Sequence, residues 1–282
     1  MRIERVLLTG GTGLVGRALA PLLAERWELR HFDVCDPGDG HPGVAGDLRD
    51  VDALRAACQG VDAVVHVAAL HGRAWREAGD EVGFEVNVLG TRNVLAAAAS
   101  NGVQRVVFTS SIWATGHGTA PPYLPIDEEL PRQPAELYGL TKKLGEQMCA
   151  YYSTRRGVST VCLRPGGILP ADAPPRDRVR LLFGAVDVRD VARAHLLALT
   201  APDDLEHGVF IVMPDTPLSE VEPAGFLENP VGALDERVPG LAACVNAGKL
   251  TLPTIGEWYT NEKARRVLGF EPQHGFDIQD YV

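Results

Sequence analysis

The chain has 282 residues, of which 45% are apolar and 23% are charged, and its formal net charge is −10 at pH 7. This composition is ordinary for a folded globular protein and excludes wholesale disorder. The acidic balance disfavours proteins that coat nucleic acid or an anionic membrane, so neither partner is expected. An anionic ligand must therefore be bound by local positive groups, such as helix N-termini or a few arginines.

The cysteines and histidines give no sign of a metal site or of a disulfide framework. The histidines include no HExxH motif. The apolar run after Met1 is too short for a signal peptide, and no stretch approaches the roughly 18 apolar residues of a membrane span. Five scattered cysteines without a CxxC pair predict reduced thiols in a cytoplasmic protein; they are Cys35, Cys58, Cys149, Cys162 and Cys244.

Short apolar runs alternate with helical patterns along most of the chain. Because the predicted strands read as continuous apolar runs, we expect a parallel sheet that is covered on both faces. From Pro214 onward the pattern weakens into loops and short helices. Strands are predicted at 5–9, 28–33, 62–68, 103–110, 158–163 and 208–213. Helices are predicted at 14–26, 50–59, 82–101, 135–156, 188–200 and 261–268.

Two proline-rich segments interrupt this alternation. Residues 119–134 contain five prolines, which is typical of a functional rim or lid. The second segment, 169–180, carries Arg176, Arg178 and Arg180. We interpret these three arginines as a solvated loop face.

The first loop is rich in glycine. From Gly10 to Gly16 it satisfies both the GxxGxxG and the GxGxxG patterns, between a predicted strand and a predicted helix, as a dinucleotide-binding turn requires. Glycine lets the chain turn tightly and lets a pyrophosphate approach without meeting a Cβ, and the helix presents its positive end to that anion. No GxxxxGK[ST] motif is present, which disfavours a P-loop nucleotide hydrolase.

Asp33 ends the second predicted strand. A carboxylate at this position accepts hydrogen bonds from the adenosine ribose and repels a 2′-phosphate, so NAD is favoured over NADP. Arg17 and Arg30 keep NADP open as the less favoured cofactor, and Asp36 competes with Asp33 for the same role.

Tyr138 and Lys142 lie four residues apart in a predicted helix and share one of its faces. The pKa of a phenol is about 10, and lowering it to about 7 requires roughly 4 kcal/mol of preferential stabilisation of the anion. A neighbouring ammonium and an oxidised nicotinamide both contribute to this. Ser110 and Ser111 end a predicted strand, where ligands bind in open α/β sheets, and a serine there can hold a substrate hydroxyl or carbonyl.

Taken in order, these segments resemble the extended short-chain dehydrogenase/reductases, the NAD-dependent epimerase/dehydratase family. The resemblance implies an α/β fold, a doubly wound parallel sheet (Rossmann fold) with a small C-terminal substrate lobe. We expect the dinucleotide-binding core over 1–170 and the lobe over 171–282, with 186–213 returning to the core. The matching segments are the turn Gly10–Gly16, Asp33, 46–48, 66–69, 87–93, 109–111, Tyr138 with Lys142, 164–166, 186–192 and 263–272.

The resemblance also implies roles for individual residues. Tyr138 would be the catalytic acid/base, Lys142 would bind the nicotinamide ribose and lower the pKa of Tyr138, and Ser111 would orient the substrate. The cofactor would contact or be supported by Gly10, Gly13, Leu14, Val15, Gly16, Asp33, Asp47, Leu48, Val67, Ala68, Ala69, Asn87, Tyr138, Lys142 and Pro165.

Other residues are candidates for substrate contacts. Arg164 ends a predicted strand at the correct edge of the sheet to meet a substrate anion, and His71 follows another strand. His117 is a weaker candidate of the same kind. For Trp75 and Trp113 we favour packing in the core or at the rim over stacking on a sugar ring.

Two departures from the family pattern narrow the reaction. Residues 112–116 include no acid, whereas dehydratases and decarboxylases of the family usually place acids there, so these reactions are disfavoured. Only 118 residues follow Arg164 (282 − 164), so the substrate lobe is small. In size and in the layout after the serines, the chain is similar to the uronate dehydrogenases of this family.

The sequence therefore predicts an NAD-dependent oxidoreductase that transfers hydride between a sugar-like hydroxyl or carbonyl and nicotinamide through a Ser-Tyr-Lys site. A sugar or nucleotide-sugar epimerase that retains its NAD is the alternative. A non-catalytic dinucleotide-binding sensor is a further one. A homodimer through the helices at 82–101 and 135–156 is usual in the family and is implied here.

Overall fold

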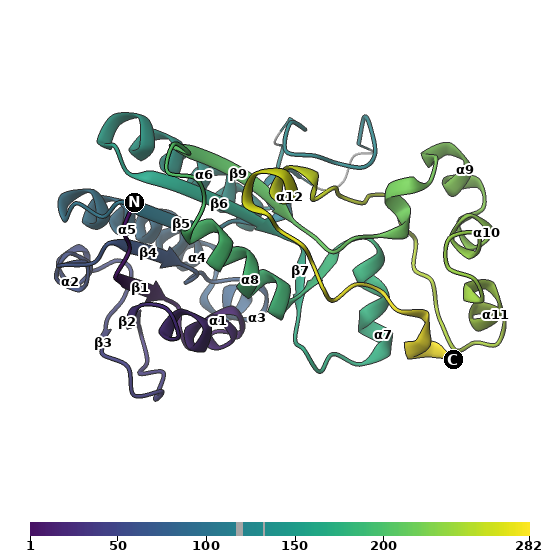
Figure 1. Cartoon of the computed structure of the whole chain (residues 1–282), viewed down its shortest axis with the longest axis horizontal. Helices are drawn as coiled ribbons and strands as arrows, with labels where there is room; N and C mark the ends of the chain where they lie inside the picture. The colour runs from purple at the N-terminus through teal and green to yellow at the C-terminus, as the bar shows by residue number, and fades with distance from the viewer. Residues whose placement is uncertain (117–120, 132) are drawn as a thin grey trace.

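The computed structural model describes residues 1–116, 121–131 and 133–282. Its centre is a seven-stranded sheet with the order β3-β2-β1-β4-β5-β6-β9, in which every pairing is parallel (Figure 1). The order reverses between β1 and β4, and ligands of such sheets bind at that point beyond the carboxyl ends of the strands. The strands are β1 (Arg5–Thr9), β2 (Glu28–Asp33), β3 (Gly43–Ala45), β4 (Ala63–His66), β5 (Arg105–Thr109), β6 (Ser159–Pro165) and β9 (His207–Val212).

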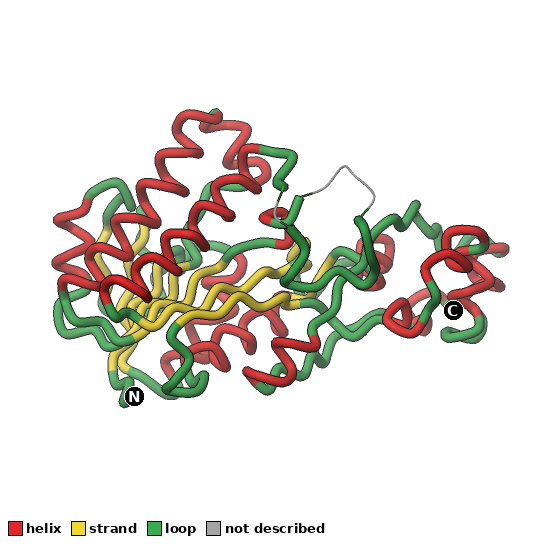
Figure 2. The backbone as a smooth tube through the Cα atoms, turned by 90° about the horizontal axis from the view of Figure 1, so that it is seen from above, coloured by secondary structure: helices red, strands yellow, loops and turns green. Residues whose placement is uncertain are grey.

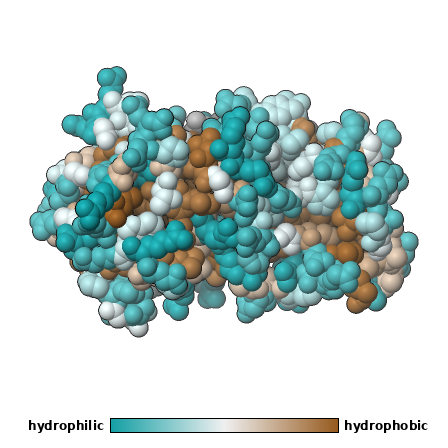
Figure 3. All heavy atoms as spheres, viewed as in Figure 1, coloured by the Kyte–Doolittle hydropathy of each residue, from teal (hydrophilic) through white to brown (hydrophobic). Residues whose placement is uncertain are grey.

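Helices cover both faces of this sheet (Figure 2). The predicted doubly wound α/β fold is thereby confirmed. On one face lie α1 (Leu14–Ala24), α8 (Val188–Leu199) and α12 (Glu262–Leu268). On the other lie α2 (Val51–Ala57), α5 (Gly90–Ser100) and α6 (Leu137–Arg156). With these apolar layers buried, the surface seen in Figure 3 is mostly hydrophilic. Within the described part of the chain, no helix is both long and apolar enough to cross a membrane.

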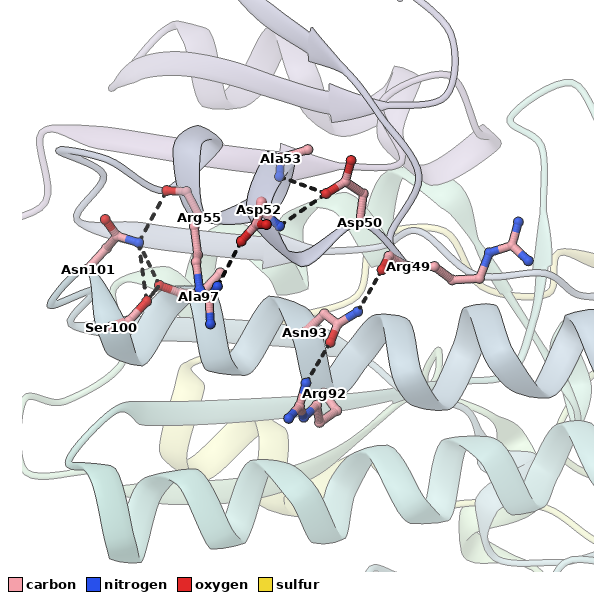
Figure 4. A network of polar contacts seen from close by, with 10 residues as sticks. All are labelled: Arg49, Asp50, Asp52, Ala53, Arg55, Arg92, Asn93, Ala97, Ser100 and Asn101. Atoms are coloured by element: carbon pink, nitrogen blue, oxygen red, sulfur yellow. Dashed lines mark hydrogen bonds and ion pairs between the residues drawn. The ribbon is translucent and has the colours of Figure 1, made fainter.

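Side-chain hydrogen bonds fasten α2 to α5 at both ends (Figure 4). Asp50 caps α2 by accepting two backbone N–H groups of its first turn. Asn93 of α5 donates to the carbonyl of Arg49, at 3.3 Å, just before this cap. Asn101, after the last turn of α5, donates to the carbonyl of Arg55 at 3.2 Å. The loop that joins β3 to α2 is thus held beside the carboxyl edge of the sheet.

The region predicted as one helix at 82–101 has a different local structure. It consists of α4 (Asp80–Phe84), a π-helical segment η1 (Glu85–Leu89) and α5. The wide turn carries Asn87, whose amide exchanges hydrogen bonds of 2.8 and 2.9 Å with the backbone of Leu70. π-turns are common at functional sites, and this one ties the helix to the loop that follows β4.

The C-terminal residues build a smaller lobe with a core of its own (Figure 1). Its helices α9 (Pro223–Glu228), α10 (Pro230–Asp235) and α11 (Leu241–Asn246) pack around Trp258 and Phe226, whose ring centroids are 5.3 Å apart. Smaller elements connect the lobe and the sheet. They are α3 (Gly72–Ala78), η2 (Ile112–Ala114), β7 (Gly167–Leu169), α7 (Pro175–Arg178), η3 (Val179–Leu182), β8 (Ala185–Asp187), η4 (Pro217–Glu220) and η5 (Ile278–Tyr281).

Candidate active site

A cavity of about 1280 Å³ opens at the carboxyl edge of the sheet. Pockets for small ligands usually measure about 300–1,000 Å³, so this one is large enough for an extended ligand beside a second molecule. Most of the residues assigned from the sequence line it: Gly10, Gly13, Leu14, Val15, Asp33, Asp47, Leu48, Val67, Ala68, Ala69, His71, Ser111, Tyr138, Lys142 and Pro165.

Two glycines of the turn, Gly10 and Gly16, have no room for a side chain. Gly10 has a φ of 80°, and a Cβ on it would lie 2.7 Å from the backbone nitrogen of Ala68. A Cβ on Gly16 would lie 2.1 Å from the carbonyl oxygen of Gly10. Gly13 precedes α1, and no described side chain caps the first turn of this helix. Its N–H groups can therefore receive a pyrophosphate, as the sequence predicted.

Asp33 is fixed at the wall of the cavity by the glycine turn. Its Oδ2 accepts hydrogen bonds from the backbone nitrogen and the hydroxyl of Thr12, at 2.9 and 3.0 Å. Its Oδ1 accepts one from the nitrogen of Cys35 at 3.3 Å. A carboxylate offers about four acceptor positions, so Asp33 retains capacity for ribose hydroxyls, and its charge disfavours an added phosphate. These residues fit NAD.

Helix α6 brings Tyr138 and Lys142 to the same cavity. The ammonium of Lys142 is buried and donates to the carbonyl of Thr109, the last residue of β5, at 2.8 Å. Its Nζ lies 5.7 Å from the ring centroid of Tyr138. Burial lowers the pKa of Lys142 to about 8, so the side chain is mostly charged at pH 7. The predicted Tyr-Lys pair is thus assembled in the structure.

Tyr138 cannot act as a base at neutral pH in these surroundings alone. Burial raises its pKa to about 12, and a hydrogen bond with Ser111 acts in the opposite direction. Ser111 lies between β5 and η2, where its hydroxyl also accepts from the backbone nitrogen of Trp113 at 3.2 Å. The close approach of η2 to α6 depends on Gly139, since a Cβ there would lie 2.4 Å from the carbonyl oxygen of Trp113.

Two more ring systems border Tyr138. The ring centroid of His71 lies 6.4 Å from that of Tyr138, and Trp75 of α3 meets Tyr138 edge-on at 6.1 Å. Burial and the nearby ammonium of Lys142 lower the pKa of His71. Trp75 is anchored by a 2.8 Å hydrogen bond from its Nε1 to Asp80. Both side chains line the cavity, so Trp75 is part of the site wall.

The assignment of Arg164 made from the sequence needs correction. The guanidinium of Arg164 is fully buried, and its Nε and Nη2 donate to the two carboxylate oxygens of Glu146, at 2.7 and 2.8 Å. It does not line the cavity, so Arg164 is not a ligand for a substrate anion. Asn87 is also buried outside the cavity wall and holds the backbone of Leu70, which fits the supporting role that the resemblance implied. His117 lies outside the described residues.

Arg180 is one of the residues lining the cavity that the sequence analysis did not assign to the site. It is exposed in the cavity wall and forms no ion pair with any residue that the structure describes. Gly167 leaves room for it, because a Cβ there would lie 2.5 Å from Nη2 of Arg180. Of its two neighbours, Arg178 pairs with Asp280 and Arg176 is exposed on α7, outside the cavity. No spacing in the sequence distinguishes the three arginines.

Comparison with known proteins agrees with this geometry. The model of the NAD-dependent epimerase/dehydratase family matches residues 6–180. The chain belongs to this family. It is 32% identical to the L-arabinose 1-dehydrogenase (NAD(P)(+)) of Haloferax volcanii over 87% of this chain and 94% of that protein. It is 33% identical to the uronate dehydrogenase of Pseudomonas syringae pv. tomato over 71% of each chain.

A solved structure extends the likeness to the whole fold. A short-chain dehydrogenase/reductase superfamily protein of Agrobacterium tumefaciens with bound NAD is 26% identical, with a TM-score of 0.75, over 99% of this chain and 94% of that one. Family membership and the fitting residues of the cavity together make NAD the cofactor.

Replacing Gly16 with alanine should weaken NAD binding at least about tenfold, or about 1.4 kcal/mol. The added Cβ overlaps the backbone of Gly10, so the turn has to shift and its N–H groups move away from the pyrophosphate. NAD affinity is measured by fluorescence titration. Gly256→Ala is the matched control, because a Cβ there meets nothing within 4 Å. Equal affinity for the two variants would contradict this role of the turn.

Proposed function

We propose that the protein is an NAD-dependent dehydrogenase that oxidises the hemiacetal hydroxyl of a free sugar, with a sugar acid as the preferred substrate. The observation that carries the proposal is the meeting of Ser111, Tyr138 and Lys142 in the cavity that holds the glycine turn. The names of the two dehydrogenase relatives, which refer to arabinose and to uronate, support a free sugar over a nucleotide sugar.

In this mechanism each of the three residues has a separate task. Ser111 donates a hydrogen bond that orients the substrate hydroxyl, and Tyr138 takes the proton of that hydroxyl. The ammonium of Lys142 stabilises the phenolate through its charge. When bound, NAD supplies the acceptor for the hydride that leaves the same carbon. The buried position of Lys142 strengthens its field at Tyr138, because little water lies between them to screen it.

Arg180 supplies the preference for a sugar acid. It is a cation in the wall of the cavity, in a protein whose net charge is −10. A guanidinium binds a carboxylate through two parallel hydrogen bonds, which fixes orientation as well as charge. An anionic substrate is therefore selected locally, against the charge of the whole chain.

We also infer that the protein is a cytoplasmic homodimer. Leu89 of η1 and Tyr151 of α6 are 51% and 54% exposed, and each offers apolar surface to a partner. The two helical segments are neighbours, so a twofold axis can place both in one interface. The free cysteines support a reducing compartment.

The proposal is tested by incubating the protein with NAD and with uronic acids, aldoses and nucleotide sugars in turn, while absorbance of NADH is recorded. A dehydrogenase accumulates NADH with a free sugar. An epimerase with retained NAD returns the hydride and gives no net signal, and a sensor gives none with any substrate.

Tyr138→Phe should lower kcat at least about 100-fold, because the phenol hydroxyl is the group that takes the substrate proton in this mechanism. NAD affinity should change little, since the phenol hydroxyl is absent but the ring is kept. Tyr151→Phe, an exposed site on the same helix, is the control for helix α6. Turnover by Tyr138→Phe at the wild-type rate would refute the mechanism.

Arg180→Met should raise KM for a uronic acid about tenfold or more, the value of one charge-assisted hydrogen bond in a site. The kcat/KM for a neutral aldose should stay within about twofold, because the lost group contacts only the carboxylate. Arg176→Met is the control, since Arg176 lies outside the cavity. If the two variants discriminate equally between the acid and the aldose, the substrate is not bound through Arg180.

A further inference from the structure

A buried carboxylate lies one turn beyond the catalytic lysine. Glu146 follows Lys142 by four residues and Tyr138 by eight, so the three side chains share one face of α6. Glu146 is only 1% exposed. It does not line the cavity and takes no part in the mechanism derived above.

The carboxylate of Glu146 connects three elements of the site. Its Oε1 accepts a 2.7 Å hydrogen bond from the hydroxyl of Ser110, which follows β5. It also binds Arg164 of β6 through both oxygens. Ser110 lines the cavity beside Ser111, and Arg164 precedes Pro165, so one bond ends at the cavity wall and the other ends one residue away from it. One side chain thereby links the helix of Tyr138 and Lys142 to the strand ends that carry the other site residues.

Stability alone is a weak explanation for this arrangement. Burying an ion pair is expensive in desolvation, and apolar side chains of similar volume often stabilise a core as well or better. A charged network does what an apolar cluster cannot, because hydrogen bonds have a direction and a narrow range of distance. The backbone hydrogen bond from Ser110 to the carbonyl of Leu163, at 2.7 Å, holds the two strand ends together in the same place.

We propose that Glu146 is a positioning residue for proton transfer, which sets Ser111 on one side and Lys142 on the other at the distances that Tyr138 requires. This inference rests on the proposed dehydrogenase function. Glu146 touches neither substrate nor cofactor in it. Glu146 positions Ser111 through its bond with Ser110, and it positions Lys142 through the helical turn of α6 that separates the two residues.

The charge of Glu146 adds a second effect on the lysine. It raises the pKa of Lys142, against the larger lowering that burial causes. The other titratable groups that face this ammonium are His66 of β4, His71 and Tyr138. Burial and Lys142 itself lower the pKa of both histidines, so these are neutral near pH 7 and do not compensate for a lost carboxylate. Arg164, paired with Glu146, keeps its own charge.

Ser110→Ala is the sharpest test, because it removes one link of the network with little change in volume. It should lower kcat about tenfold or more, as expected for small displacements of catalytic groups, while the Kd for NAD stays unchanged. Ser153→Ala is the matched control. Ser153 is a buried serine of the same helix that donates a 2.7 Å hydrogen bond to the backbone carbonyl of Glu206, away from the cavity. If both variants lose equal stability and equal kcat, Glu146 is only structural.

Glu146→Gln gives a readout that needs no substrate. In the NAD complex of this variant the pKa of Tyr138, followed by ultraviolet absorbance of the phenolate, should be higher than in the wild type, because Lys142 loses its proton at lower pH. An unchanged pKa overturns the inference. Since this titration does not depend on turnover, it separates failure of the inference from failure of the proposed function, which would show as a wild type that reduces no NAD with any sugar.

Discussion

The site depends on one buried ammonium. Lys142 is enclosed between α6 and the end of β5, and it donates a hydrogen bond to the backbone carbonyl of Thr109. Burying a cation is unfavourable unless other groups stabilise its charge. Here a carbonyl oxygen, two aromatic rings and a carboxylate one helical turn away stabilise the ammonium. This constraint requires that α6 lie close against the sheet. Gly145 allows it, because a Cβ there would lie 2.5 Å from the ring of Phe108.

In the proposed mechanism, the same enclosure makes the site residues and the cofactor depend on one another. Burial that strengthens the field of Lys142 also raises the pKa of Tyr138 to about 12, so the phenol is inert until further positive charge enters the cavity. An oxidised nicotinamide supplies that charge when bound. In the proposed mechanism, cofactor binding and activation of the tyrosine are coupled through electrostatics.

Sequence patterns predicted the core of the fold well, since local signals coincide there with tertiary structure. The predicted bounds of β1 and β2 are those observed, and α6 ends at the predicted residue, where Gly157 adopts a left-handed conformation. The glycine turn and the Tyr-Lys pair depend on spacings within one strand–helix unit, which the chain displays directly. The sequence did not predict the individual helices of the smaller lobe, because its elements are short and its core residues come from distant segments.

Two arginines show where such reasoning stops. Arg164 ends a strand at the functional edge, yet its side chain turns to Glu146, a partner eighteen residues earlier whose role no local pattern reveals. Arg180 follows a proline-rich segment that looks like surface, and only tertiary contacts with Gly167 place it in the cavity. Packing across the sheet decides which buried acid pairs with which base. The periodicity of the sequence does not predict these pairs.

The most direct measurement of the central claim is the titration of Tyr138 in the wild-type protein, with and without NAD, using the Tyr138→Phe difference spectrum to isolate it from the other tyrosines. The account predicts a midpoint near pH 12 for the free protein and a midpoint several units lower in the complex. A midpoint that NAD leaves in place would show that the phenol, the ammonium and the redox ring do not share one cavity, and would contradict the account.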